Sequence, residues 1–227
     1  MKFQSRMSAF WGVLVFCLMQ WSSTVSALES PKVDVEKTTK GLLETFEKNV
    51  GSYQENPDAF VQEVSKELTP VVAFEAIARG VMGKYTRRSE PEQIVQFSQV
   101  FKDSLLSFYG KALLKLDNTY LSIDKIDDVS KKTLEDYEAG KARLVPVDMV
   151  IKTSTRTVAI SYSMVHVDGR WKMRNIIVDG INIGKQFRNQ FAEAVDTHGD
   201  IQYVIDHWLD IMSGKDQIDK NGSANKI

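Results

Sequence analysis

Cysteine is nearly absent from this chain, since Cys17 is the only one among 227 residues. A single cysteine cannot form a disulfide within the chain, so a hydrophobic core must stabilise the fold. The three histidines, His166, His198 and His207, lie far apart and lack the ligand spacing of a zinc site. The glycines likewise lack the spacing of a phosphate-binding P-loop. The sequence therefore predicts no metal site and no cofactor.

Neither sign of charge is in excess, since 29 basic residues face 30 acidic ones. Charges of both signs alternate along the chain without long blocks, as on a solvated surface. Proteins that bind nucleic acid usually carry a basic stripe. The composition therefore argues against a nucleic-acid partner.

A long apolar run is also lacking. Lys2 and Arg6 precede an apolar block at residues 10–19, and small residues follow as far as Ala27. The block is shorter than the roughly 20 residues that a helix needs to cross a bilayer, which argues against a retained membrane anchor. This three-part pattern predicts an exported protein whose signal peptide, residues 1–27, is cleaved after Ala27.

The rest of the chain is long enough for one domain without covalent cross-links. We expect a single domain over residues 28–213 and a disordered tail over residues 214–227, where glycine, serine and charged residues prevail. No internal repeat divides the domain.

A β-hairpin is predicted between Thr157 and Val178, because apolar residues alternate with small or polar ones on both sides of Asp168-Gly169. Asp-Gly favours a two-residue turn in which both residues have positive φ. After Gly184 the apolar spacing becomes helical. The sheet and this helix are therefore expected to share a core.

Apolar periodicity predicts further elements on either side of this hairpin. Helices are expected over residues 35–50, 57–68, 74–82 and 91–113, with Asn56 as the cap of the second, and a last helix from Asp200. Strands are expected near 120–126 and 143–151, and a polar connection over 134–140. Helices before an antiparallel sheet indicate the α+β class. We predict about four strands packed on a helical amino-terminal half, in a cone like that of nuclear transport factor, with an apolar pocket inside.

Several of these elements offer large apolar faces, which can pack solidly or leave a pocket between them. The residues that would line such a pocket are Phe74, Ile77, Ala78, Val81, Met82, Phe97, Phe101, Leu105, Phe108, Tyr109, Val147, Met149, Val158, Ile160, Tyr162, Met164, Ile177, Ile181 and Phe187. Arg79 and Tyr85 are candidates for the pocket rim, where a guanidinium suits a phosphate. Alternatively, Arg79 pairs with Glu75 one helical turn earlier.

Two classes of function are open at this point, an enzyme and a structural binding module. A cone-shaped α+β fold can host an acid-base enzyme for an apolar substrate, and His166 and Asp148 on neighbouring strands are its candidate groups. A structural module that only binds partners would instead have a solid core and no ligand.

The order of motifs resembles the MlaC or toluene-tolerance family of periplasmic phospholipid-binding proteins. The resemblance rests on Val81-Met82-Gly83-Lys84-Tyr85, Gly169 with Trp171, Val178-Asp179-Gly180-Ile181 and Phe187-Arg188. Thr86 and Asn175 depart from it, since an aromatic and an acidic residue are expected there.

This resemblance implies a periplasmic carrier that holds phospholipid tails in the pocket and catalyses no reaction. The implied partners are an outer-membrane lipoprotein complex and an inner-membrane ABC transporter complex, between which lipid is shuttled to maintain outer-membrane asymmetry.

Overall fold

The computed structural model describes residues 28–113 and 121–215, so the predicted signal peptide and all but two residues of the predicted tail lie outside it. Its elements, in chain order, are α1 (Lys32–Glu55), α2 (Pro57–Leu68), α3 (Phe74–Met82), the 3-10 helix η1 (Gly83–Arg88), α4 (Pro91–Leu113), β1 (Leu121–Ile126), α5 (Lys131–Glu138), β2 (Val145–Thr153), β3 (Thr157–Val167), β4 (Arg170–Val178), β5 (Ile181–Asn182), α6 (Ile183–His198), α7 (Ile201–Asp206) and α8 (Trp208–Ser213). The predicted α+β class is confirmed. Within the described residues, no helix is both long and apolar enough to cross a membrane.

The strands form one antiparallel sheet in sequence order, from β1 at one edge to β5 at the other. The predicted hairpin joins β3 to β4, and its turn residues Asp168 and Gly169 have φ values of 53° and 73°. A second Asp-Gly pair, Asp179 and Gly180, repeats this turn with φ values of 48° and 81°. This second turn adds the short β5, so the sheet has five strands where about four were expected.

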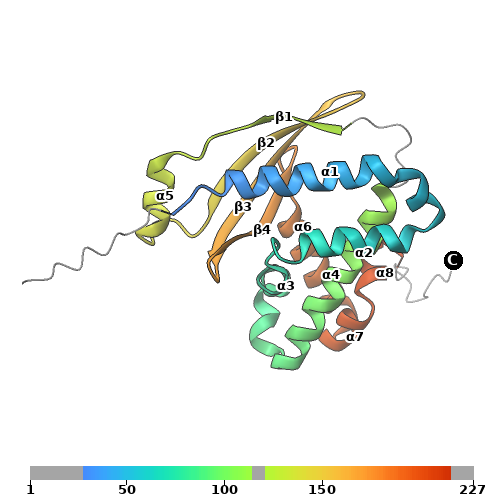
Figure 1. Cartoon of the computed structure of the whole chain (residues 1–227). Coiled ribbons are helices and arrows are strands. Elements are labelled where there is room, and N and C mark those ends of the chain that lie inside the picture. The colour runs from blue at the N-terminus through green and yellow to red at the C-terminus, as the bar shows by residue number, and fades with distance from the viewer. Residues whose placement is uncertain (1–27, 114–120, 216–227) are drawn as a thin grey trace, which may run out of the picture.

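The two faces of the sheet differ in character. Val147 pairs with Tyr162, which pairs with Ile176, so these side chains share one face, which we call the inner face. Asp148, Ser161 and Ile177 pair in the same way on the opposite, outer face. Helix α1 runs along the inner face (Figure 1), where Val35 packs with residues of β2, β3 and β4. The inner face is therefore the covered one.

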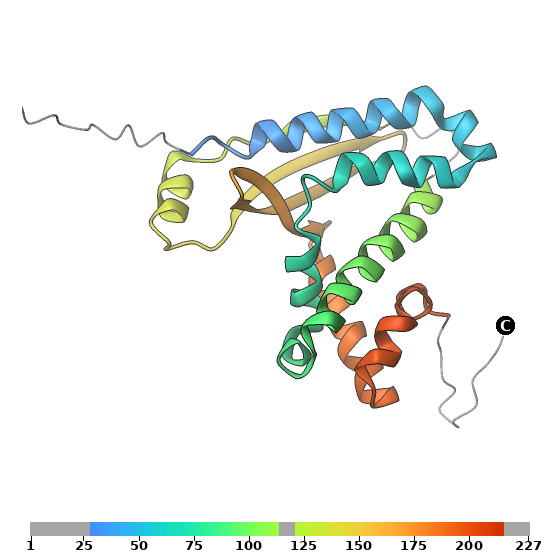
Figure 2. The same ribbon diagram turned by 60° about the horizontal axis from the view of Figure 1, so that its bottom comes forward.

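Helices α1 and α2 pack against each other as an antiparallel pair (Figure 2). Helix α1 continues through Gly51, where a helix end was expected, and ends at Glu55. One glycine costs only about 1 kcal/mol in a helix interior, so it need not end one. Asn56 then caps α2, as predicted, with its side-chain oxygen accepting from the amide of Ala59 at 3.2 Å.

The buried residues of α3, η1, α4, α6, α7 and α8 form a separate helical core around Trp208. The Trp208 ring lies 5.3 Å from that of Phe97 and 5.8 Å from that of Phe191, centroid to centroid. Phe97 and Phe101 of α4 are fully buried there. Phe97 and Phe101 were expected to line the pocket, but they pack on the carboxy-terminal helices, because α6, which follows β5 directly, brings Phe187 and Phe191 to them.

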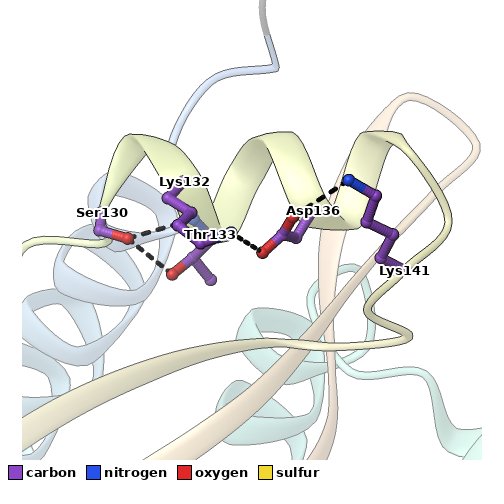
Figure 3. Close-up of polar contacts among 5 residues, drawn as sticks. All are labelled: Ser130, Lys132, Thr133, Asp136 and Lys141. Atoms are coloured by element: carbon purple, nitrogen blue, oxygen red, sulfur yellow. Dashed lines mark hydrogen bonds and ion pairs between the residues drawn. The ribbon is translucent and has the colours of Figure 1, made fainter.

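Two further segments differ from expectation. The predicted last helix is split at His207 into α7 and α8. Helix α5 overlaps the predicted polar connection over residues 134–138, and none of its residues is buried. Figure 3 shows what stabilises it: the Ser130 hydroxyl accepts from the Thr133 amide at 3.1 Å, and Asp136 pairs with Lys132 at 2.8 Å.

The helical core and the sheet are joined at two places. In the α2–α3 link, the Ala73 amide donates to the Met173 carbonyl at 2.9 Å, and the Met173 amide donates to the Val71 carbonyl at 2.8 Å. At the start of α6, Asn175 accepts from the Gly184 amide at 3.1 Å and donates to Asn182 at 3.2 Å. An acid at position 175 would lack this donor, which explains the asparagine there.

Candidate functional site

An apolar cavity of about 70 Å³ lies between α1 and the inner face of the sheet. It is lined by Asp34, Val35, Thr38, Thr39, Leu42, Leu68, Val71, Val72, Tyr162, Met164, Trp171 and Met173. Pockets that hold a drug-sized ligand usually have volumes of about 300–1,000 Å³. The cavity is therefore a narrow gap between two layers in this conformation.

One side of α1 forms the first wall of the cavity. Val35, Thr38, Thr39 and Leu42 are spaced by three or four residues, which places them on one face of the helix. Leu42 also packs against the small cluster of Phe60 of α2 and Leu106 of α4. The two threonines bring polar atoms into an interface that would bury more apolar surface with larger side chains.

Strands β3 and β4 supply the opposite wall, where Tyr162 is the most informative residue. Burial raises the pKa of its phenol to about 12, against a smaller lowering effect of a hydrogen bond with Thr39 of α1. The tyrosine thus stays neutral at physiological pH and links the two walls of the cavity.

The cavity meets the protein surface beside Asp34 and Val71. Both residues also line two surface depressions, one along α1 and α2 and one beside the β3–β4 turn. Asp34 is exposed, whereas Val35 next to it is buried. The cavity therefore has an opening where the amino-terminal part of α1 lies near the α2–α3 link.

Only part of the predicted pocket lining belongs to this site. Tyr162 and Met164 line the cavity. The residues that share the inner face with them are Val147, Met149, Val158 and Ile160. Val147 and Met149 are buried, whereas Val158 and Ile160 are partly exposed.

Most of the other predicted lining residues lie in or against the helical core, away from the cavity. Ala78, Val81, Met82, Phe97, Phe101 and Phe187 are buried in it, and Ile77 and Leu105 pack against it. Periodicity identifies these residues as apolar faces, but it does not say which other face covers each of them.

The remaining predicted lining residues lie elsewhere. Ile177 is on the outer face of the sheet, and Ile181, at the turn into β5, is 59% exposed. Phe108 and Tyr109 of α4 are 40% and 46% exposed, with ring centroids 5.1 Å apart. The Lys102 ammonium lies over the Phe74 ring, 5.8 Å from the ring centroid.

The two rim candidates also lie outside the cavity lining. Arg79 pairs with Glu75 through a nitrogen–oxygen contact of 2.9 Å, as the alternative interpretation expected. The Tyr85 ring is buried in the helical core, and its hydroxyl donates to Asp196 at 2.5 Å.

Most of the cavity lining was missed from the sequence. Val35 and Leu42 lie in a predicted helix, and Trp171 and Met173 in the predicted hairpin, but the sequence assigns none of them to the pocket. Leu68, Val71 and Val72 come from the end of α2 and the link after it. The alternation in β4 indicates its inner residues, but no local pattern shows that α1 is the helix that covers them.

The acid-base candidates do not meet. His166 pairs with Trp171, two positions beyond Met164 on the inner face, and its ring lies 5.2 Å from the Trp171 ring. Asp148 is exposed on the outer face. Among the described residues, no group of three or more histidine, cysteine or acidic side chains could hold a metal ion.

The chain matches a family model, a known protein sequence and a solved structure. The family model described as MlaC protein matches residues 36–210. A toluene tolerance protein, ttg2D, of Pseudomonas putida is 36% identical over 220 residues, which cover 95% of this chain and 96% of that protein. The solved structure of a phospholipid-binding protein from Ralstonia solanacearum, in complex with a phospholipid, has a TM-score of 0.66 at 20% identity and covers 80% of this chain and 96% of its own.

Proposed function

This chain belongs to the MlaC family, and from that premise we propose that it binds a phospholipid and carries it as a soluble complex. The acyl tails would lie between α1 and the inner face of the sheet. The head group would stay near the surface, where the cavity opens beside Asp34 and Val71.

The observation that carries this proposal is the apolar cavity beneath α1. Its walls are mainly aliphatic or aromatic, and its few polar side chains do not form a catalytic pair. The fold resembles that of a protein solved with a phospholipid bound. A diacyl lipid has about 30 methylenes, and exposing each to water costs about 0.8 kcal/mol, which opposes its exit from a membrane. A lipid carrier therefore requires an enclosed apolar site that keeps the tails out of water.

The small volume of the cavity indicates a conformational change on binding. A gap of about 70 Å³ cannot hold two acyl chains, so α1 and the inner face must separate to admit them. The helical core need not change, because it buries its own apolar surface independently of the cavity. Lipid would then replace the contacts that α1 loses.

Membership of the MlaC family also supports a cellular location for the carrier. We propose that residues 1–27 are a cleaved signal peptide and that residues 28–213 work as one domain in the periplasm. The carrier would shuttle lipid between an outer-membrane lipoprotein complex and an inner-membrane ABC transporter complex, and so maintain the lipid asymmetry of the outer membrane.

Solvent extraction and mass spectrometry of the protein purified from a Gram-negative host test this proposal. We expect co-purified phospholipid, and we expect the protein to move a fluorescent phospholipid from donor to acceptor vesicles. A protein that carries no lipid and takes none up from vesicles would refute the proposed function.

A further inference from the structure

A surface depression of about 690 Å³ adjoins the opening of the cavity. Its lining shares Asp34, Val71 and Trp171 with the cavity. The Trp171 indole nitrogen donates to the Glu29 carbonyl at 2.7 Å, which fixes one side of the depression. The apolar cavity therefore opens into a more polar surface depression, one side of which is held by the bond between Trp171 and Glu29.

Four charged residues line this depression: Lys37 and Asp34 of α1, Arg170 of β4, and Glu29. Within the described ranges, none of the four forms a side-chain ion pair, although Lys32 and Lys40 of the same helix pair with Asp128 at 2.5 Å and Glu36 at 2.6 Å. Two cations and two anions at one opening, none of them paired with another described residue, leave charges of both signs for a ligand.

We propose that this depression binds the head group of a zwitterionic phospholipid, with its phosphate near Lys37 and Arg170 and its ammonium near Asp34 and Glu29. This inference rests on the proposed function. Arg170 can offer a phosphate two parallel donors, and Lys37 adds a point charge. A carboxylate favours an ammonium but repels a head group that carries only negative charge, so the acids select for the zwitterion.

Reloading from mixed vesicles tests the selection. The protein is stripped of lipid, mixed with vesicles of equimolar phosphatidylethanolamine and phosphatidylglycerol, and reisolated, and its lipid is measured by mass spectrometry. We expect wild type to enrich phosphatidylethanolamine about three-fold or more over the vesicles. The variant Glu29→Gln, whose side chain lines the depression and not the cavity, should lower this enrichment while it still binds lipid.

The role of Lys37 and Arg170 is tested by how long the protein retains its lipid. The double variant Lys37→Ala, Arg170→Ala should lose its lipid to acceptor vesicles about three to ten times faster than wild type. Arg174→Ala and Glu193→Gln are matched controls, because both side chains are exposed and outside the depression and the cavity. Both controls should behave as wild type does.

The outcomes separate this inference from the proposed function. If wild type carries lipid, and Glu29→Gln and the double variant Lys37→Ala, Arg170→Ala match the controls in lipid ratio and retention, the head-group site is wrong and the carrier function stands. If no sample carries phospholipid, both fail. Titration of the lipid-free protein with inorganic phosphate should give no saturable binding at millimolar concentrations; tight binding of phosphate alone would identify an anion site that does not depend on lipid and overturn the inference.

Discussion

The helical core and the layer of α1 on the sheet are built from similar apolar residues but packed differently. In the helical core, Phe97, Phe101, Phe191 and Trp208 are fully buried, and their rings contact one another. Across the cavity, Tyr162 and Met173 are only partly buried and face threonines of α1. One region is closed by its own side chains, and the other leaves a gap.

This difference separates stability from binding. A densely packed aromatic cluster loses several kcal/mol when one ring is removed, so the helical core can stabilise the fold whether or not a ligand is bound. The interface at the cavity is incompletely packed and partly polar, so separating α1 from the sheet there breaks fewer apolar contacts. A carrier that must open and close benefits from confining the change to one layer.

The largest effect is expected from a charge in the helical core. Phe101→Asp removes a fully buried ring and places a carboxylate among aromatic side chains, which costs several kcal/mol for each change. Because a domain is typically stable by about 5–15 kcal/mol, we expect the variant to be largely unfolded. Circular dichroism with urea titration measures this, and a cooperative transition close to that of wild type would show that the core is not closed.

A smaller effect is expected from alkaline pH in the cavity layer. An unfolded tyrosine has a pKa near 10, whereas burial raises the pKa of folded Tyr162 to about 12. Between these values the unfolded state binds fewer protons, so stability falls as pH rises, by about 2–3 kcal/mol in total.

Tyr162→Phe should remove this part of the pH dependence while the other titrating groups are unchanged. Urea titrations of both proteins from pH 9 to 12 give the difference in slope. Parallel curves would mean that the phenol is not buried beneath α1.

A third effect concerns the junction between the two regions. A Cβ added at Gly184 would clash with the Asn175 side-chain oxygen, so Gly184→Ala must displace that side chain and its hydrogen bonds. We expect a loss of about 1–3 kcal/mol in the free energy of unfolding. Adding Asn175→Ala should recover part of this loss, because it removes the clash; a double variant less stable than Gly184→Ala would contradict the explanation.

The sequence predicted the class, the hairpin and most helix positions because these depend on local periodicity and turn chemistry. Asp168-Gly169 and the Asn56 cap are examples. It did not predict which apolar faces meet. The stripe of Phe97 and Phe101 is compatible with either the sheet or the carboxy-terminal helices, and only the tertiary arrangement decides between them.

The cavity was harder to predict for the same reason. Tyr162 and Met164 were assigned correctly to one face of a strand, but Ile177 was assigned to the same face. The bulge between β3 and β4 adds one residue to β4, after Met173 and before Asn175, and so shifts its alternation. A pattern read with strict period two cannot include that shift.

One pair of variants on β4 tests the central claim most directly. Met173 lines the cavity and Ile177 lies on the outer face, and both side chains are partly buried. We expect folded Ile177→Asp to co-purify with as much phospholipid as wild type, and folded Met173→Asp to carry little or none, because an acyl chain offers a carboxylate no partner. Lipid retained by Met173→Asp and lost by Ile177→Asp, as measured by mass spectrometry, would place the lipid on the other face of the sheet and contradict the account.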